Sequence, residues 1–472
     1  MQTNRRLSRG RALAIGVCLF FSGFASCVKF ECATFDGSCR GEGLLPWMLL
    51  LNNQASQACG IYEAGLVSVA SDKTQANAAS SAASISANGR YVLFTSAATN
   101  LVAGDTNGFS DVFLHDRATG ETTRVSAGSG GIQATGGASQ SGFISEDGRY
   151  VAFLSEATNL VAGDTNGVRD AFVYDRVDSV TTRISTATAG TEGDQNAFEV
   201  GISADGRYVP FASSATNIVA GDTNGTPDTY LHDRTTGVTS RESLTDGGAE
   251  ATGGAVSQQV KTSRNASVYA FSSDHPNIVA GDTNADNDIF VRDFTAGTTV
   301  RVSVATGGTE GVGGFSLTPS VSGDGRVVAW FSGMTNLVAG DTNGLQDVFL
   351  HERETGITSR ISVASDGSQT TTGSSSAPAV NADGRYVVFQ SDSTNLVTDD
   401  TNAATDIFLR DRLNSTTTRL SLSVNDGVQG NGASSVAMIS LDCPSVVFQS
   451  AATNLVTNDT NGFADIFVRN IP

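Results

Sequence analysis

Short apolar stretches alternate with longer polar stretches along most of this chain, and the alternation recurs at a nearly constant interval. A clear copy runs from Ser84 to Ser126, SISANGRYVLFTSAATNLVAGDTNGFSDVFLHDRATGETTRVS. Its apolar pieces predict four short strands, at 83–86, 90–96, 111–117 and 122–126. Turns at Asn88-Gly89 and Thr119-Gly120 and a 14-residue loop, 97–110, separate them. Consecutive apolar residues at 112–114 indicate strands that are covered on both faces.

The tripeptide Asp-Thr-Asn marks each copy of this pattern. It begins at Asp105, Asp164, Asp222, Asp282, Asp341, Asp400 and Asp459, in steps of 59, 58, 60, 59, 59 and 59 residues. Repeats of one four-stranded antiparallel unit are typical of a β-propeller, in which each sheet packs between its neighbours. The sequence therefore predicts an all-β fold, a seven-bladed β-propeller.

The two ends of the repeat region indicate how the ring closes. The last copy stops at Pro472, directly after 465–469, and so lacks its fourth strand. Val67–Asp72 (VSVASD) nearly duplicates Ile361–Asp366 (ISVASD) ahead of the first copy. We expect this N-terminal strand to complete the last blade, because strand exchange removes two open sheet edges.

The N-terminal region predicts export. Arg5, Arg6, Arg9 and Arg11 precede an apolar run, 12–25, that suits a signal peptide and is too short to span a bilayer. Residues 24–27, Phe-Ala-Ser-Cys, resemble the lipobox of bacterial lipoproteins, in which Cys27 would be lipidated. The alternative is cleavage near Ala25 and a soluble secreted product. We divide the chain into a signal peptide (1–26), a tether with a short apolar segment at 43–51 (27–64) and the propeller (65–472).

The repeated strands carry a family resemblance. Residues 147–153 (DGRYVAF) and 170–176 (DAFVYDR) resemble the WD-like repeats of TolB-type β-propellers, and the likeness covers roughly 67–472. That resemblance implies the propeller fold. It implies no single function, since such propellers serve as periplasmic scaffolds, as peptidase domains and as polysaccharide lyases. The longer loop before the third strand and the lack of a separate N-terminal domain depart from TolB, so docking to TolB partners is not implied.

The repeated 14-residue loop has two readings. Asp105, Asn107 and Asp111 resemble part of the calcium loops of integrin-type propellers and EF-hands, in which alternate oxygen side chains point inward on a tight turn. The other reading is turn chemistry, with Asp and Asn side chains holding an Asx turn. The candidate ligands in the remaining loops are Asp164, Asn166, Asp170, Asp222, Asn224, Asp228, Asp282, Asn284, Asp288, Asp341, Asn343, Asp347, Asp400, Asn402, Asp406, Asp459, Asn461 and Asp465.

The net charge of the chain limits the classes of binding partner that we expect. The net charge of −19 repels phosphate backbones and anionic headgroups, so we expect no nucleic-acid partner and membrane contact only through a lipid anchor. We expect a monomer that binds an unidentified protein or glycan. The recurring arginines Arg90, Arg117 and Arg124 are expected to pair with carboxylates of the Asp116 type.

Catalytic signatures are scarce. No Gly-x-Ser-x-Gly or His-Glu-x-x-His occurs, and His115, His232 and His351 occupy one repeated strand position that fits a structural role. His275 has no counterpart in the other copies. We therefore expect a non-enzymatic binding scaffold at the cell envelope; the alternative is a glycan-active enzyme, a lyase or hydrolase, with His275 as its acid–base group.

The positions of the cysteines suggest a disulfide where the ring closes. Cys443 replaces the glycine of the first turn in the last blade, and Cys59 precedes the closing segment by the spacing that would place it at the same end of that blade. We predict a Cys59–Cys443 disulfide, with Cys32 and Cys39 free to pair locally. The competing view pairs Cys59 within the tether and leaves Cys443 as a buried thiol.

Overall fold

The structure, a computed structural model, describes residues 16–21, 24–29, 59, 62–443 and 445–471. The chain forms two compact units, Met1–Ala58 and Cys59–Pro472. In the first, β1 (Gly16–Phe21) pairs antiparallel with β2 (Phe24–Lys29), over part of the predicted signal peptide. Cys32, Cys39 and the segment 43–51 lie outside the described residues. Nothing in the described part of the chain is a helix long and apolar enough to cross a membrane.

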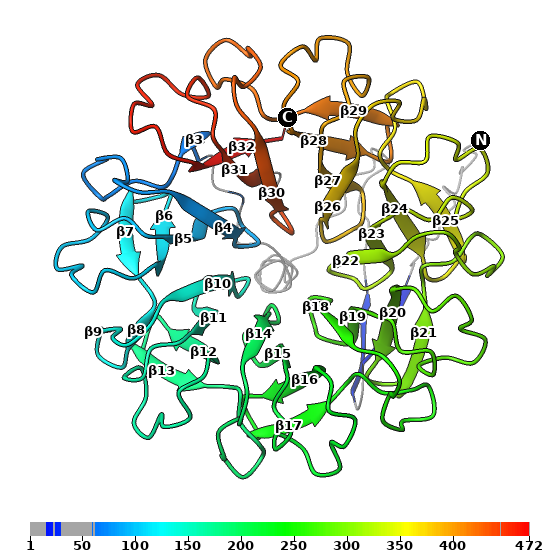
Figure 1. The fold of residues 1–472 in the computed structure, drawn as a ribbon, viewed down its shortest axis with the longest axis horizontal. Coiled ribbons are helices and arrows are strands. Elements are labelled where there is room, and N and C mark those ends of the chain that lie inside the picture. Colours follow the sequence, from blue (N-terminus) through cyan, green and yellow to red (C-terminus); the bar gives the residue numbers. More distant parts are fainter. Residues whose placement is uncertain (1–15, 22–23, 30–58, 60–61, 444, 472) are drawn as a thin grey trace, which may run out of the picture. The chain divides into compact units, whose positions relative to one another are not determined.

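The second unit is a ring of sheets (Figure 1). In the part of the chain that the structure describes, it contains seven four-stranded antiparallel sheets, which confirms the predicted seven-bladed propeller. The first strands, nearest the centre of the ring, are β4 (Ser80–Ile85), β10 (Ser139–Ile144), β14 (Ala197–Val200), β18 (Val256–Thr262), β22 (Ser316–Val321), β26 (Ser375–Val380) and β30 (Ser434–Ile439). The second strands are β5 (Tyr91–Ser96), β11 (Tyr150–Ser155), β15 (Tyr208–Ser213), β19 (Val268–Ser273), β23 (Val327–Ser332), β27 (Tyr386–Ser391) and β31 (Ser445–Ser450).

The outer half of each blade follows the repeated loop. The third strands are β6 (Asp111–Asp116), β12 (Asp170–Asp175), β16 (Asp228–Asp233), β20 (Asp288–Asp293), β24 (Asp347–Glu352), β28 (Asp406–Asp411) and β32 (Asp465–Asn470). The fourth strands are β7 (Glu121–Arg124), β13 (Val180–Arg183), β17 (Val238–Arg241), β21 (Thr298–Arg301), β25 (Ile357–Arg360), β29 (Thr416–Arg419) and β3 (Gly65–Leu66). Beyond the first blade, β8 (Ala127–Gly128) and β9 (Ile132–Gln133) form a short hairpin.

The core lies between the blades. One apolar cluster joins Leu93 and Val112 of the first blade to Val151 and Phe153 of the second. All six residues of β6 are buried, as expected for a strand covered on both faces. Aromatic side chains of the second and third strands stack within a blade, as Phe94 does on Phe113 with ring centroids 5.9 Å apart. Each blade therefore buries its apolar side chains against its neighbours.

The closing strand lies slightly earlier than the sequence predicts. β3 pairs with β32 through Gly65–Val468 and Leu66–Phe467, and the Val67 N–H donates to the Ile466 carbonyl at 2.9 Å. The segment expected to form this strand, Val67–Asp72, mostly follows it, and Val69 forms a bridge with Gln75 instead. The reason is that ISVASD, which it duplicates, likewise follows the fourth strand β25. An N-terminal strand therefore does complete the last blade, but it lies at Gly65–Leu66 and not at 67–72.

A disulfide joins the start of this unit to its last blade. Cys59 and Cys443 are bonded with their Cα atoms 5.5 Å apart, across a sequence separation of 384 residues. Cys443 lies in the turn between β30 and β31, and Cys59 precedes β3. The bond therefore lies within the blade where the ring closes.

Candidate functional site

The repeated loops bring each predicted Asp-Asn-Asp set together, and the asparagine organises it. In the first blade, the Asn107 amide donates to Asp111 at 2.9 Å and to the Ala134 carbonyl at 3.2 Å. Its oxygen accepts the Phe109 N–H at 2.9 Å, which forms an Asx turn. The asparagine-to-aspartate bond recurs in all seven loops at 2.7–3.2 Å. The asparagine thus contributes to the turn as the turn-chemistry reading expects.

The second aspartate of each loop is a buried structural anchor. Asp111 is 1% exposed and also accepts a hydrogen bond from the Ser126 hydroxyl at 2.6 Å. Ser126 in turn accepts the Val112 N–H at 2.9 Å. Burial raises the pKa of the corresponding Asp170 and Asp228, and hydrogen bonds from serine oppose that rise. A buried carboxylate needs a compensating charge or hydrogen bonds to remain ionised.

Six of the seven described loops have such a charge in their own blade. The guanidinium Nη1 of Arg124, at the end of the fourth strand, is 3.2 Å from Asp105 and 3.7 Å from Asp111. Its equivalents are Arg183, Arg241, Arg301, Arg360 and Arg419, with distances of 3.0–3.4 Å to the first aspartate and 3.1–3.4 Å to the second.

This arrangement corrects the expected partners of the repeated arginines. Arg90 does pair with Asp116 at 2.7 Å, as the sequence predicts. Arg124 pairs with the loop aspartates instead, and Arg117 donates to the Gly89 carbonyl at 2.6 Å. The three arginines therefore have three separate structural roles.

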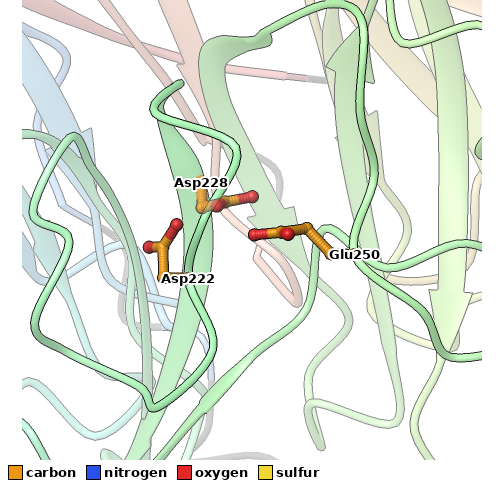
Figure 2. A group of neighbouring side chains, drawn as sticks. All are labelled: Asp222, Asp228 and Glu250. Atoms are coloured by element: carbon orange, nitrogen blue, oxygen red, sulfur yellow. The ribbon is translucent and has the colours of Figure 1, made fainter.

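Three loops have a third carboxylate, a glutamate from the following hairpin, and in two of them the described carboxylates lie close enough to hold a metal ion. Asp222, Asp228 and Glu250 in the third blade point toward one another (Figure 2), and Asp282, Asp288 and Glu310 do so in the fourth; in each group the ligand oxygens lie within 4.8 Å of one another. Arginine already lies among them, because Arg241 Nη1 is 2.7 Å from Glu250 and Arg301 Nη1 is 2.6 Å from Glu310.

In the fourth-blade group, the effect of burial on the carboxylates is opposed by the positive charge of Arg301. Burial raises the pKa of Asp282 to about 6, against the attraction of Arg301. Burial also acts on Glu310, but hydrogen bonds from Thr283 and Arg301 hold the pKa of Glu310 at about 2. Arginine thus supplies the positive charge that a metal ion would otherwise bring.

The last blade departs from this pattern. Its fourth strand comes from the N-terminal segment and ends in Leu66, at the position that holds arginine in the other blades. Asp459, Asn461 and Asp465 are nevertheless present, and Asn461 donates to Asp465 at 2.7 Å. Among the described residues, neither aspartate forms a salt bridge with an arginine or lysine.

The histidines are structural. His115, His232 and His351 each place Nδ1 2.9 Å from a threonine hydroxyl of the fourth strand. Burial lowers the pKa of His115 to about 4. His275, the candidate acid–base group, is 0% exposed, with Nδ1 2.7 Å from the Ser273 hydroxyl. A side chain without solvent access cannot reach a substrate, so His275 loses the role proposed for it.

Polar residues without counterparts in the other blades gather around the axis of the ring. The turns between first and second strands hydrogen-bond from blade to blade, as in Ala204 N–H to the Arg264 carbonyl at 3.0 Å. The Arg264 side chain bonds Glu146 of the second blade through Nε at 2.6 Å and Asp442 of the seventh through Nη2 at 2.5 Å. Because blades two, four and seven are not neighbours, this guanidinium lies across the axis.

A second axial group lies on the first strands of blades two, three and four. The Lys261 ammonium is 3.7 Å from Glu199 and 3.8 Å from the centre of the Phe143 ring. Both charged side chains keep about a quarter of their surface exposed, 24% and 22%. Burial lowers the pKa of Lys261 and raises that of Glu199, each against the attraction of its partner.

The repeat pattern and the motifs of the sequence indicate neither axial group. An alignment of the seven turns could have found Arg264 and Glu146, because the equivalent positions hold Ala87, Ala204, Gly323, Ala382 and Leu441. A charged residue at a position that elsewhere is small or apolar is not required by the blade. Its contacts, however, depend on ring closure, which no local pattern shows.

Comparison with protein-family models and with curated protein sequences gives no match. Solved structures do match. TolB from Acinetobacter baumannii is 17% identical, with 66% of this chain and 59% of that one covered and a TM-score of 0.37. An oligogalacturonate lyase from Vibrio parahaemolyticus is 13% identical, with 82% and 88% covered and a TM-score of 0.49. A prolyl endopeptidase is 13% identical, with 92% and 56% covered and a TM-score of 0.50. This chain therefore spans little more than half of the TolB and endopeptidase chains.

These similarities concern the fold. The seven blades of four antiparallel strands agree with the β-propeller that the repeated strands predict. A propeller fold alone does not choose between a scaffold and an enzyme.

Proposed function

We propose that this protein is a non-enzymatic β-propeller that is exported and binds a protein or glycan partner at the cell envelope. The observation that carries the proposal is the contrast between repeated and non-repeated polar residues. The repeated ones, such as Arg124 with Asp105, form ion pairs with one another inside the blades. The non-repeated Lys261, Glu199 and Arg264 face the axis and remain partly exposed.

The chemistry of the axial groups suits recognition. Lys261 and Glu199 offer a cation and an anion, and the Lys261 ammonium lies over the Phe143 ring. Few polar groups placed beside an aromatic ring are typical of binding sites for peptides and sugars. Export rests on the basic N-terminus and the apolar run 12–25, and lipidation at Cys27 is part of the same proposal.

The test is capture from envelope extracts and on a glycan array by the full exported chain. We expect capture to be lost in Lys261→Ala and in Arg264→Ala. The matched control is Arg326→Ala. Arg326 is 63% exposed, and its side chain pairs with Glu354 at 3.2 Å instead of with an axial residue. Equal capture by all three variants would overturn the axial site.

A glycan-active enzyme is the second candidate, and the Lys261–Glu199 pair is the observation that favours it. A lysine with lowered pKa beside a carboxylate with raised pKa is an arrangement found in acid–base catalysis. Polysaccharide degradation that is abolished by Lys261→Ala but kept by His275→Gln would establish this candidate and overturn the non-enzymatic one. No turnover across a screen of acidic and neutral polysaccharides would support the scaffold.

Calcium in every loop is not favoured by the charges. In six loops a calcium ion would have to displace a guanidinium that already contacts both aspartates. We propose that arginine serves as the cation of these six loops. Calcium binding to wild-type protein with six or more ions per chain would contradict this.

A further inference from the structure

The last blade buries two carboxylates that have no positive partner among the residues that the structure describes. Asp465 is 0% exposed and Asp459 is 8% exposed. Asp465 accepts hydrogen bonds from Ser68 at 2.6 Å and from Asn461 at 2.7 Å. Asp459 Oδ1 is fully buried and accepts no hydrogen bond.

The unpartnered oxygen distinguishes this blade from the others. Asp400 Oδ1 in the sixth blade also lacks a hydrogen bond, but it lies 3.1 Å from Arg419 Nη1. In the last blade Leu66 replaces that arginine and packs against a cluster of apolar residues. Burial and the charge of Asp465 raise the pKa of Asp459, and burial raises the pKa of Asp465. An uncompensated buried charge of this kind is costly in stability.

The contacts of the repeated arginine in the other blades show which groups converge at the position that Leu66 takes in the last blade. In the other blades its guanidinium contacts both aspartates and, in three of them, the glutamate of the following hairpin. In four of these blades its Nη2 also donates to the carbonyl that precedes the first aspartate, as to Asp399 at 2.9 Å in the sixth blade. The equivalent groups in the last blade are Asp459, Asp465, Gln75 and the Asn458 carbonyl.

Each of these groups has an oxygen atom that can act as a metal ligand. Gln75 already joins the N-terminal segment to the loop, because Nε2 donates to the Asn458 carbonyl at 2.7 Å and Oε1 accepts the Thr460 N–H at 3.2 Å. Two carboxylates with carbonyl oxygens are ligands that calcium prefers, with water completing six to eight positions.

We propose that the closing blade holds one divalent cation of the calcium type, bound by Asp459 and Asp465 where the other blades have arginine. Its further oxygen ligands come from Gln75 and the Asn458 carbonyl. Because Gln75 belongs to the N-terminal segment, whereas Asp459 lies in the last repeated loop and Asp465 begins β32, the ion stabilises ring closure. The inference is independent of the proposed partner binding.

The first experiment counts calcium ions on the full exported chain by equilibrium dialysis at pH 7. We expect one ion per chain, with a Kd on the order of 10⁻⁴–10⁻³ M, as in extracellular modules with few acidic ligands. Saturating calcium should raise the melting temperature by ~1–3 °C over chelator. No bound ion, or an ion in every loop, would overturn the proposal.

Variants locate the ion. Asp459→Asn and Leu66→Arg should both abolish binding, the second by restoring the guanidinium. The matched control Asp400→Asn, in the sixth blade, should still bind one ion. Should Asp459→Asn fail to fold, Leu66→Arg alone decides, and calcium binding that survives it would contradict the site.

A shared proton is the competing way to compensate the two carboxylates. It predicts no calcium binding at pH 7, together with a melting temperature that rises as the pH falls and does so less in Asp459→Asn. That result would overturn the cation site. Calcium binding that weakens as the pH falls from 7 to 5 would support it, because protons compete for the carboxylates.

Discussion

The sixth and seventh blades have the same four-stranded sheet but differ in what compensates their buried charges. In the sixth, one continuous segment supplies the loop aspartates Asp400 and Asp406 and the arginine Arg419 that contacts both. In the seventh, the fourth strand comes from the other end of the chain and brings Leu66. Strand exchange therefore closes the ring at the level of the backbone without completing the charge pattern of the blade.

A second ion pair is also missing from the closing blade. Arg385 pairs with Asp411 at 2.7 Å in the sixth blade, and Asn470 takes the place of that aspartate in the seventh. Asn470 instead donates to the Tyr62 carbonyl at 2.7 Å and accepts from Arg117 of the first blade at 3.2 Å. The closing blade thus relies on neutral hydrogen bonds, on a neighbouring blade and on a disulfide.

The largest effect is expected from the disulfide. Cys59→Ala should lower the free energy of unfolding by ~3–5 kcal/mol, because the bond closes a loop of nearly the whole propeller in the unfolded chain. Urea unfolding of the oxidised protein measures this. Cys59 is exposed, so lost packing contributes little.

Reduction provides the control for this prediction. The reduced wild-type protein should match Cys59→Ala, and adding reductant to the variant should change nothing further. Non-reducing peptide mapping checks the bond directly. A Cys59 peptide linked to Cys32 or Cys39 would show that the disulfide is formed elsewhere.

The next effect comes from giving the sixth blade the composition of the seventh. Arg419→Leu leaves Asp400 and Asp406 buried without their cation, which should cost ~3–5 kcal/mol. Adding Asp400→Asn should restore part of the loss, since one of the two charges is then gone. Thermal unfolding in chelator measures both. An Arg419→Leu protein as stable as wild type would show that the guanidinium is not needed in these loops.

A smaller effect tests whether the closing strand is formed as tightly as an ordinary fourth strand. Ser68 donates to Asp465 and accepts the Ile466 N–H at 3.0 Å, and Ser421 accepts the Ile407 N–H at 3.1 Å in the sixth blade. Ser68→Ala and Ser421→Ala should each cost ~1–3 kcal/mol, because each leaves a buried acceptor or donor unpaired. A cost near zero for Ser68→Ala alone would mean that the closing segment is frayed.

The sequence predicted those features that every copy of the repeat shares. Strand limits fell within a few residues, as for 90–96 against the observed Tyr91–Ser96, because turn residues and apolar runs recur in register. The partner of Arg124 was not predicted, because the sequence allows Arg124 to pair with either Asp116 or Asp105. Only the strand register decides between these two aspartates. The axial contacts of Arg264 escaped because they join three blades that are far apart in sequence.

The smallest expected effect is on the free energy of unfolding at acidic pH. The Arg385 guanidinium donates hydrogen bonds to Asp411 and holds the pKa of that carboxyl at about 2, against an ordinary value of 3.8. The pair therefore stabilises the protein fully above pH 4, and this contribution is lost as the pH falls from 4 toward 2. Arg385 is about one-third exposed, so solvent screens the pair and its contribution is small. Arg385→Gln should flatten the decline of unfolding free energy between pH 4 and 2, whereas Asn470→Gln in the closing blade, which has no carboxylate there, should leave its slope unchanged. Urea unfolding at pH steps across this range measures both, and parallel curves for wild type and Arg385→Gln would show that the pair contributes nothing to the acid response.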